Sequence, residues 1–275
     1  MKIFNTNIGP VIQSEQSYFI VSDLTFDQLI NQENLFSFLK NYISKTSESN
    51  INLNDILLAP IVSQEIWASG VTYLRSKNAR MEESKDAGGG DFYDRVYEAA
   101  RPELFFKATA ARTVGHKEKI RIRKDSKWNV PEPELTLFVN STGKIAGYTV
   151  GNDVSSRDIE GENPLYLPQA KSYDKSAAIG PGILVLETPI SRDTEINLEI
   201  LRNNEVVFQQ KTQLNQMKRE LTELVEYLTK ECTFPQGCFL MTGTGIVPPD
   251  SFSLISGDLV NITIDAIGTL SNPVE

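Results

Sequence analysis

Histidine and cysteine are scarce in this 275-residue chain, which has one histidine, His116, and two cysteines, Cys232 and Cys238. Metal centres built from several histidines and zinc sites built from clustered thiolates are therefore excluded. The cysteines are separated by five residues and form no CxxC pair. We therefore expect two reduced thiols rather than a disulfide.

Positive charge and long apolar runs are also in short supply. Lysine and arginine total 27 against 36 acidic residues, which gives a formal net charge of −9 and a pI near 4.9. Neither nucleic acid nor an anionic membrane is expected as a partner of such a surface. No stretch approaches the ~20 apolar residues of a membrane span, and the N-terminus is polar where a signal peptide is apolar. We expect a cytoplasmic protein.

The remaining composition predicts a folded protein with a β-rich major part. Hydrophobic residues make up 40% and charged residues 23%, as is typical of globular chains. Residues 1–57 combine a strand-like piece at 18–21 with an amphipathic helix around 29–43. Strand-like runs separated by glycine, proline and asparagine follow. We expect a small N-terminal domain at 1–57 and a larger domain at 58–275.

Two patterns locate further elements of the larger domain. Consecutive asparagines, Asn203 and Asn204, tolerate the positive φ angles of a tight turn, so they predict a hairpin with strands at 198–201 and 206–209. Apolar residues at helical spacing predict a helix over 214–230 that packs against the sheet.

The segment at 75–100 has a different character, because it is charged, helix-prone and interrupted by Gly88, Gly89 and Gly90. A run of glycines is equally compatible with a surface loop and with the hinge of a lid over a binding site. The helix-prone sequence on both sides favours a lid.

A further hairpin carries acidic residues at its base. Residues 134–139 alternate between polar and apolar, a turn-forming sequence follows, and residues 144–150 return as the second strand. Glu132 and Glu134 occupy positions i and i+2, so their side chains leave the same face of the strand about 7 Å apart.

Antiparallel pairing brings a third carboxylate to this position. With the turn centred near Ser141 and Thr142, Glu132 lies opposite Gly151 and within two residues of Asp153. Three converging carboxylates repel one another unless a hard cation lies among them, and oxygen-only ligation suits Mg²⁺, Mn²⁺ or Ca²⁺ but not zinc. Solvated acidic residues at strand ends are the alternative interpretation.

Several segments resemble the fumarylacetoacetate hydrolase superfamily in sequence, order and spacing. They are RPELFFKA at 101–108, PEPEL at 131–135, GYTVGNDVSSRD at 147–158 and MTGT at 241–244. Within this superfamily, ENPLYLPQAK at 162–171 and the pair Gly115-His116 are more similar to the 2-keto-3-deoxy-D-arabinonate dehydratase branch than to the hydrolases. The similarity covers residues 59–275.

The resemblance implies a mixed α+β, β-rich fold with a β-roll or barrel-like core and a small N-terminal α/β domain. It also implies a small 2-oxo acid as substrate and a homo-oligomer, either a dimer or a tetramer. The implied metal ligands are Glu132, Glu134 and Asp153, with Mg²⁺ preferred over Mn²⁺ and Ca²⁺.

The resemblance further implies which residues act on the substrate. Lys171 matches the active-site lysine of the superfamily, and Glu103 matches the acidic residue of the dehydratase branch. The implied substrate-binding residues are Thr244, Tyr73, Ser69 and Arg157.

One departure from the superfamily pattern favours a dehydratase. The hydrolases carry a catalytic histidine shortly after a Gly-x-x-Tyr segment, whereas this chain reads GVTYLRSK at 70–77. The single histidine, His116, precedes strand-like residues at 120–123 in a lysine-rich loop, where a structural role is expected.

The implied reaction is the dehydration of a 2-keto-3-deoxy sugar acid to a 2,5-dioxo acid. A cation that holds the carboxylate and keto oxygens of a 2-oxo acid stabilises the enolate formed when a C3 proton leaves, and the C4 hydroxyl can then be eliminated. We assign Lys171 as the base and Glu103 as the acid, although the two roles could be exchanged.

Two other hypotheses stay open at this point. An acylpyruvate-type hydrolase or a 2-oxo acid decarboxylase could use the same metal platform. A non-catalytic Ca²⁺-binding β module would need the three carboxylates only, and Lys171 and Glu103 would then form an ordinary surface ion pair.

Overall fold

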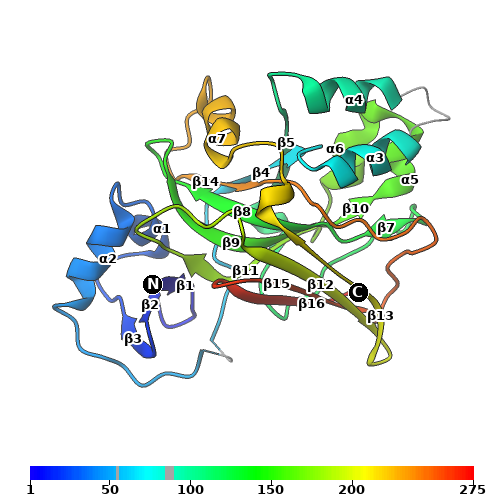
Figure 1. Cartoon of the computed structure of the whole chain (residues 1–275). Coiled ribbons are helices and arrows are strands. Elements are labelled where there is room, and N and C mark those ends of the chain that lie inside the picture. The colour runs from blue at the N-terminus through cyan, green and yellow to red at the C-terminus, as the bar shows by residue number, and fades with distance from the viewer. Residues whose placement is uncertain (54–55, 84–89) are drawn as a thin grey trace.

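The computed structural model describes residues 1–53, 56–83 and 90–275 (Figure 1). Two glycines of the predicted hinge, Gly88 and Gly89, lie outside the described residues. The described parts of this segment are α3 (Leu74–Glu83) and α4 (Gly90–Glu98). A lid over residues 75–100 therefore stays a prediction.

A ten-stranded sheet forms the centre of the fold (Figure 1). Its order is β3 (Ser17–Ile20), β2 (Val11–Ser14), β1 (Lys2–Phe4), β11 (Ala177–Leu184), β9 (Ile145–Asp153), β8 (Pro133–Val139), β14 (Cys238–Met241), β4 (Glu65–Gly70) and β5 (Glu103–Thr109), with β6 (Thr113–Val114) beside β11. Neighbouring strands are antiparallel except β14 with β4 and β11 with β6. Since β3 and β5 are edges, the described residues form an open roll rather than a closed barrel.

The N-terminal strands belong to this same sheet, because β1 pairs antiparallel with β11. Strands from both predicted domains therefore share one sheet, and the boundary between residues 57 and 58 stays a prediction. The predicted fold class, mixed α+β and β-rich, is confirmed.

A second sheet packs against one face of the first. Its strands are β13 (Glu205–Gln213), β12 (Glu195–Arg202), β15 (Leu259–Ile264) and β16 (Gly268–Pro273), in that order, and β7 (Asn129–Val130) pairs separately with β10 (Ser155–Ser156). Leu135 and Leu137 of β8 are buried in one core cluster with Leu198 and Ile262. Alternation along β8 directs its odd-numbered residues to this core and its even-numbered residues, including Glu134, to the other face.

Helices cover that other face and the ends of the sheet. On the N-terminal side, α1 (Phe26–Ile30) and α2 (Leu35–Ile43) place Leu29 and Leu39 in a core cluster with Ile66 and Phe138. α3 and α4 gather with α5 (Arg157–Glu162) and α6 (Leu167–Lys171) at the upper right of Figure 1. α7 (Leu221–Thr229), at the top of Figure 1, adds the buried side chains of its apolar face to the same core cluster as Leu135 and Leu198. Among the described residues, no helix is both long and apolar enough to span a membrane.

Three predicted elements differ from the structure. The N-terminal helix is divided into α1 and α2, because α1 ends at the cap residue Asn31 and α2 begins after Asn34. The helix predicted over 214–230 was too long at its start, where a 3₁₀ turn at Leu214–Gln216 precedes the capping box of α7. Of the strand predicted at 120–123, only Ile120 pairs, in an isolated bridge with Val274.

Both predicted hairpins are confirmed, but the register of one was off by two residues. Asn203 and Asn204 have φ angles of 53° and 64° and connect β12 to β13. In β8–β9, Ala146 forms a bulge, since Val139 pairs with Ile145 while Phe138 pairs with Gly147. The turn shifts the pairing by one residue, because Val139 pairs with Ile145, and the bulge shifts it by one more, so residue 132 faces residue 153 rather than residue 151.

Candidate active site

Five strand ends meet at one end of the ten-stranded sheet. β8 and β5 begin there, while β9, β14 and β4 end there. The register places Glu134 opposite Gly151 and Gly70 opposite Glu103. Segments distant in sequence therefore deliver their side chains to one place.

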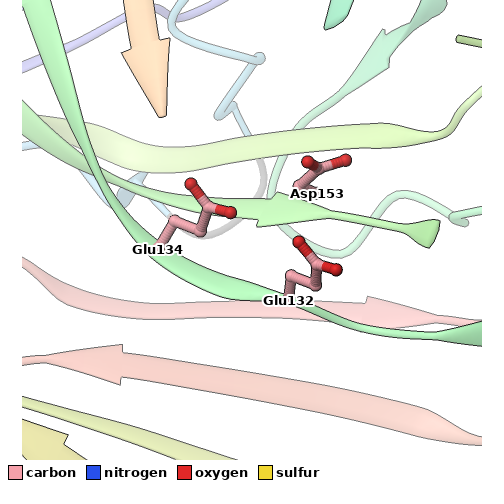
Figure 2. A group of neighbouring side chains, drawn as sticks. All are labelled: Glu132, Glu134 and Asp153. Atoms are coloured by element: carbon pink, nitrogen blue, oxygen red, sulfur yellow. The ribbon is translucent and has the colours of Figure 1, made fainter. Parts of the chain in front are cut away.

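Glu132, Glu134 and Asp153 form a buried carboxylate cluster at this end, with their side chains side by side (Figure 2). One oxygen from each residue lies within 4.8 Å of the others, and no residue of the three is more than 4% exposed. The N–H of Asp153 donates to the Glu132 carbonyl at 3.0 Å and fixes the two strands together. Oxygens about 2.0–2.6 Å from one ion lie within about 5 Å of each other, so this set fits a hard divalent cation.

Lys171, the last residue of α6, is fully buried against this cluster. Its Nζ donates to Glu132 Oε2 at 2.9 Å, to Asp153 Oδ2 at 3.1 Å and to Ser155 Oγ at 2.6 Å. The ring of Phe105 lies 5.7 Å from the same nitrogen. An ordinary surface ion pair is therefore wrong for Lys171.

Further cations surround the carboxylates. Arg157 Nη2 lies 2.9 Å from Glu132 Oε1, and Arg80 of α3 lies 3.6 Å from the same oxygen. Arg80 also pairs with the buried Glu160 of α5. The four carboxylates of Glu132, Glu134, Asp153 and Glu160 thus face four cationic side chains, those of Arg80, Lys107, Arg157 and Lys171.

The two glutamates of the cluster have opposite electrostatic surroundings. Burial disfavours ionisation of Glu132, but the charges of Lys171, Arg157 and Arg80 outweigh it and hold the pKa of Glu132 well below its usual value. For Glu134, burial and then the charges of Asp153 and Glu132 raise the pKa well above its usual value. Among the described residues, Glu134 has no ion-pair partner and accepts a 2.5 Å hydrogen bond from the Gly243 N–H.

Glu103 reaches the site from the first position of β5. Its carboxyl occupies the space beside Gly70, where an added Cβ would lie 2.0 Å from Glu103 Oε2. Burial raises the pKa of Glu103, and the charges of Arg80 and Lys171 partly oppose this shift. A carboxyl that keeps its proton more firmly than an ordinary glutamate is suited to act as a general acid.

The structure brings the predicted substrate-binding residues to the same end of the sheet. Their side chains differ in whether they already make hydrogen bonds within the protein. Ser69 Oγ donates to the Glu103 carbonyl at 2.9 Å, and Thr244 Oγ1 is engaged with the backbone of Ile246 at 3.1 Å. The Tyr73 hydroxyl is buried without a hydrogen-bond partner among the described residues. Burial and then the charge of Glu134 raise the pKa of Tyr73. Substrate binding by these residues and Arg157 stays a prediction.

Sequence reasoning missed three charged residues of the site, Arg80, Lys107 and Glu160, and one hydroxyl, that of Ser155. Alternate positions group Lys107 with Glu103 and Phe105, but the structure has a bulge at Lys107, so alternation alone does not place its side chain. No comparable pattern separates the buried charges of α3 and α5 from solvated ones.

His116 has a structural contact away from the carboxylate cluster. Its Nδ1 accepts a hydrogen bond from the Ser271 N–H at 3.1 Å, and the side chain is half-buried. Burial lowers the pKa of His116, so a neutral imidazole that accepts this bond is favoured.

Comparisons with known proteins agree with this site. The family model described as fumarylacetoacetate (FAA) hydrolase C-terminal matches residues 65–275. A probable 2-keto-3-deoxyxylonate dehydratase of Haloferax volcanii is 50% identical over 218 residues, which are 78% of this chain and 73% of the relative. The 2-dehydro-3-deoxy-D-arabinonate dehydratase of Saccharolobus solfataricus is 45% identical over 231 residues, 82% of this chain and 77% of the relative.

A solved structure extends the likeness to the whole chain. The 2-keto-3-deoxy-D-arabinonate dehydratase complexed with magnesium and 2,5-dioxopentanoate superposes with a TM-score of 0.85 at 36% identity, covering 100% of this chain and 99% of that one. From the family match and these relatives, we conclude that the chain belongs to the fumarylacetoacetate hydrolase family.

Proposed function

We propose that this protein is a divalent-metal-dependent hydro-lyase that dehydrates a 2-keto-3-deoxy sugar acid of the 2-keto-3-deoxy-D-arabinonate type to 2,5-dioxopentanoate. The observation that carries the proposal is the placement of Lys171 on a buried cluster of three carboxylates with Glu103 at the same end of the sheet. The two dehydratase relatives and the magnesium complex of the structural neighbour support it.

Glu132, Glu134 and Asp153 are the proposed ligands of the cation, for which Mg²⁺ is preferred over Mn²⁺ and Ca²⁺. Their oxygen-only donors and their spacing fit a hard ion. When bound, the ion supplies Lewis-acid polarisation of the carboxylate and keto oxygens of a 2-oxo acid.

Charge balance supports an anionic substrate. With Lys171 neutral, as a base must be, three cations remain beside the four carboxylates, so a divalent cation leaves one positive charge in excess at the site. A substrate carboxylate can offset part of that excess in a buried environment where unpaired charge is costly.

Lys171 is the proposed base, which accepts a proton from C3 of the substrate through Nζ. Glu103 is the proposed acid, which donates a proton to the C4 hydroxyl as the C4–O bond breaks and water leaves. A C3–C4 double bond forms, and proton shifts along C3 to C5 then convert the C5 alcohol into the aldehyde of the 2,5-dioxo acid. The raised pKa of Glu103 supports its role as the proton donor.

Hydrolysis of an acylpyruvate is disfavoured by the position of the only histidine. The His116 ring accepts the Ser271 N–H and is not part of the cluster of Glu132, Glu134 and Asp153, so it is poorly placed to activate water there. We expect negligible release of pyruvate from acetylpyruvate beside dehydration of a 2-keto-3-deoxypentonate. Efficient release would favour the hydrolase hypothesis.

The proposed function is tested by a ¹H NMR time course with Mg²⁺ and each enantiomer of 2-keto-3-deoxypentonate. We expect one enantiomer to give the aldehyde signal of 2,5-dioxopentanoate. Absence of that signal with both enantiomers would overturn the substrate assignment.

We further propose that the protein works as a cytoplasmic homo-oligomer, either a dimer or a tetramer, as the family resemblance implies. Light scattering coupled to size-exclusion chromatography measures the mass of the particle against the 30.7 kDa chain. Fractionation of the source cells tests the location.

A further inference from the structure

Lys107 of β5 is a fully buried lysine to which the reaction above assigns no part. Its Nζ lies 2.6 Å from Asp153 Oδ1 and donates to the carbonyls of Val154, at 3.0 Å, and of Lys171. An ammonium group has three N–H donors. Two of them are donated to these carbonyls, and the ammonium group forms an ion pair with the Asp153 carboxylate.

We propose that Lys107 is a positioning residue that fixes Asp153 and Lys171 relative to each other. The proposal rests on the function proposed above, in which Asp153 is a metal ligand and Lys171 is the base. It concerns geometry only, because Lys107 acts through these two residues and contacts neither the cation nor the substrate.

The Asp153 carboxylate is held at both of its oxygens. Lys107 holds Oδ1, and the Lys171 Nζ holds Oδ2 at 3.1 Å. Rotation of the carboxylate about its Cβ–Cγ bond would break one of these contacts. Asp153 therefore presents one defined oxygen to the carboxylate cluster.

The backbone of Lys171 is held in the same way. Its carbonyl lies at the end of α6, where helix carbonyls have no partner within the helix. Lys107 Nζ and Ser176 Oγ, the latter at 2.9 Å, both donate to this oxygen. The point from which the Lys171 side chain extends is therefore fixed to β5.

β5 thus carries the proposed acid and also holds the proposed base. Glu103 opens β5, and Lys107 lies in a bulge of the strand, between Phe106, which pairs with Trp67, and Ala108, which pairs with Ile66. At that bulge Lys107 holds the carbonyl of Lys171. The strand therefore links the two groups that exchange protons with the substrate.

A purely stabilising role does not explain this arrangement. Replacing a buried ion pair by apolar side chains of similar volume is often neutral or stabilising, so three polar contacts are not needed to fill the space. The three contacts are explained if the Asp153 carboxylate and the C-terminal end of α6 must keep one fixed relative position.

The test compares Lys107→Met with the wild-type full-length protein below the unfolding temperature of both. Calorimetry with Mg²⁺ alone should give a dissociation constant raised by about 10-fold or more, as for other groups that orient metal ligands. At saturating Mg²⁺, kcat for the 2-keto-3-deoxypentonate should fall by roughly 10- to 100-fold, with KM changed by less than about 3-fold. Wild-type Mg²⁺ affinity and wild-type kcat would overturn the proposal.

Lys107→Arg serves as the second variant, because it keeps the charge if the methionine variant does not fold. The planar guanidinium cannot direct three N–H groups from one nitrogen at three acceptors, so kcat should fall here too. Wild-type constants in this variant would likewise overturn the proposal.

Arg202→Met is the matched control, since Arg202 pairs with the buried Asp258 at 2.8 Å on the four-stranded sheet. It should lower thermal stability without changing Mg²⁺ affinity or kcat, and equal losses in both variants would reduce Lys107 to a structural residue. If the wild type does not dehydrate the pentonate, the proposed function fails, while the Mg²⁺ measurement still tests how Lys107 orients Asp153.

Discussion

The two hairpins β8–β9 and β12–β13 are both antiparallel, yet they lie in very different environments. Every residue of β8 is buried, whereas β13 is exposed along most of its length. β8 lies inside the ten-stranded sheet with packed layers on both faces, and β13 is an edge strand of the four-stranded sheet. The burial of each strand therefore follows its position in the layers, and its polarity agrees, since β8 is mostly apolar and β13 mostly polar.

This difference in burial determines the free-energy cost of an ionised carboxylate on each hairpin. Glu205 on β13 is exposed and can remain solvated, while Glu134 on β8 is 1% exposed and lies beside two other carboxylates. Burial of like charges without a counterion is strongly unfavourable. Acidic residues of the same type are therefore ordinary surface groups on one hairpin and candidate metal ligands on the other.

The largest loss of activity is expected from removing the cation. Exhaustive chelation should lower dehydration by more than about 1,000-fold, because the cluster can no longer polarise the keto oxygen. Glu134→Gln should abolish Mg²⁺ binding measured by calorimetry, while Glu205→Gln on the exposed hairpin should leave binding and turnover unchanged. Undiminished turnover after chelation would contradict the metal assignment.

The next largest effect is expected from the buried lysine of the cluster. Lys171→Ala should reduce kcat by about 100- to 10,000-fold, the usual contribution of a general base, while Mg²⁺ still binds. Lys211→Ala on β13 is the control, since Lys211 pairs with Glu195 at 2.9 Å on the surface and should be dispensable. Turnover retained in Lys171→Ala would exclude it as the base.

A smaller loss is expected from adding one methyl group at position 70. In Gly70→Ala the new Cβ would overlap Glu103 Oε2, so the carboxyl has to move, and a displacement of this kind costs roughly 10- to 100-fold in kcat. In a Glu103→Gln background the same change should have little further effect, because the group it displaces is already inactive. Additive losses in steady-state kinetics would show that Gly70 acts on something else.

The smallest effects are those of side-chain truncations on protein stability. One truncation in each hairpin compares the two hairpins directly. Leu137→Ala in β8 should lower the free energy of unfolding by about 2–5 kcal/mol, since the side chain is fully buried. Val207→Ala in β13, where the side chain is 42% exposed, should change it by less than about 0.5 kcal/mol. Chemical denaturation of both variants measures the difference, and equal destabilisation would mean that β13 is covered in solution.

Local patterns were sufficient to predict the hairpins and the convergence of the carboxylates. They failed where the outcome depends on contacts between distant segments. The turn shifts the pairing one position further along β9 than predicted, and the bulge at Ala146 has no marker in the local alternation, so together they misplaced the pairing of Glu132 by two residues. The helix predicted at 214–230 starts late because the capping residues of α7, Glu220 and Glu223, compete with a continuous apolar stripe.

The acidic residues of the candidate site could be predicted from the sequence, whereas its basic residues could be predicted only in part. Lys171 was identified through the family motif, whereas Arg80 and Lys107 were missed because each meets the cluster only through tertiary packing. Counting the charge of a predicted carboxylate cluster and searching for cations to balance it would have directed attention to both residues.

The bulge also bears on how the length of this chain can vary. Surface turns usually tolerate insertions and deletions, and the turn between β8 and β9 lies at the opposite end of the hairpin from the carboxylates. A net change of one residue in the turn or bulge would shift the pairing and direct alternate side chains of β9 to the other face. Asp153 would then leave the cluster although no site residue had been altered. Evolutionary change in this turn should therefore be restricted to substitutions, or to paired insertions and deletions that restore the register.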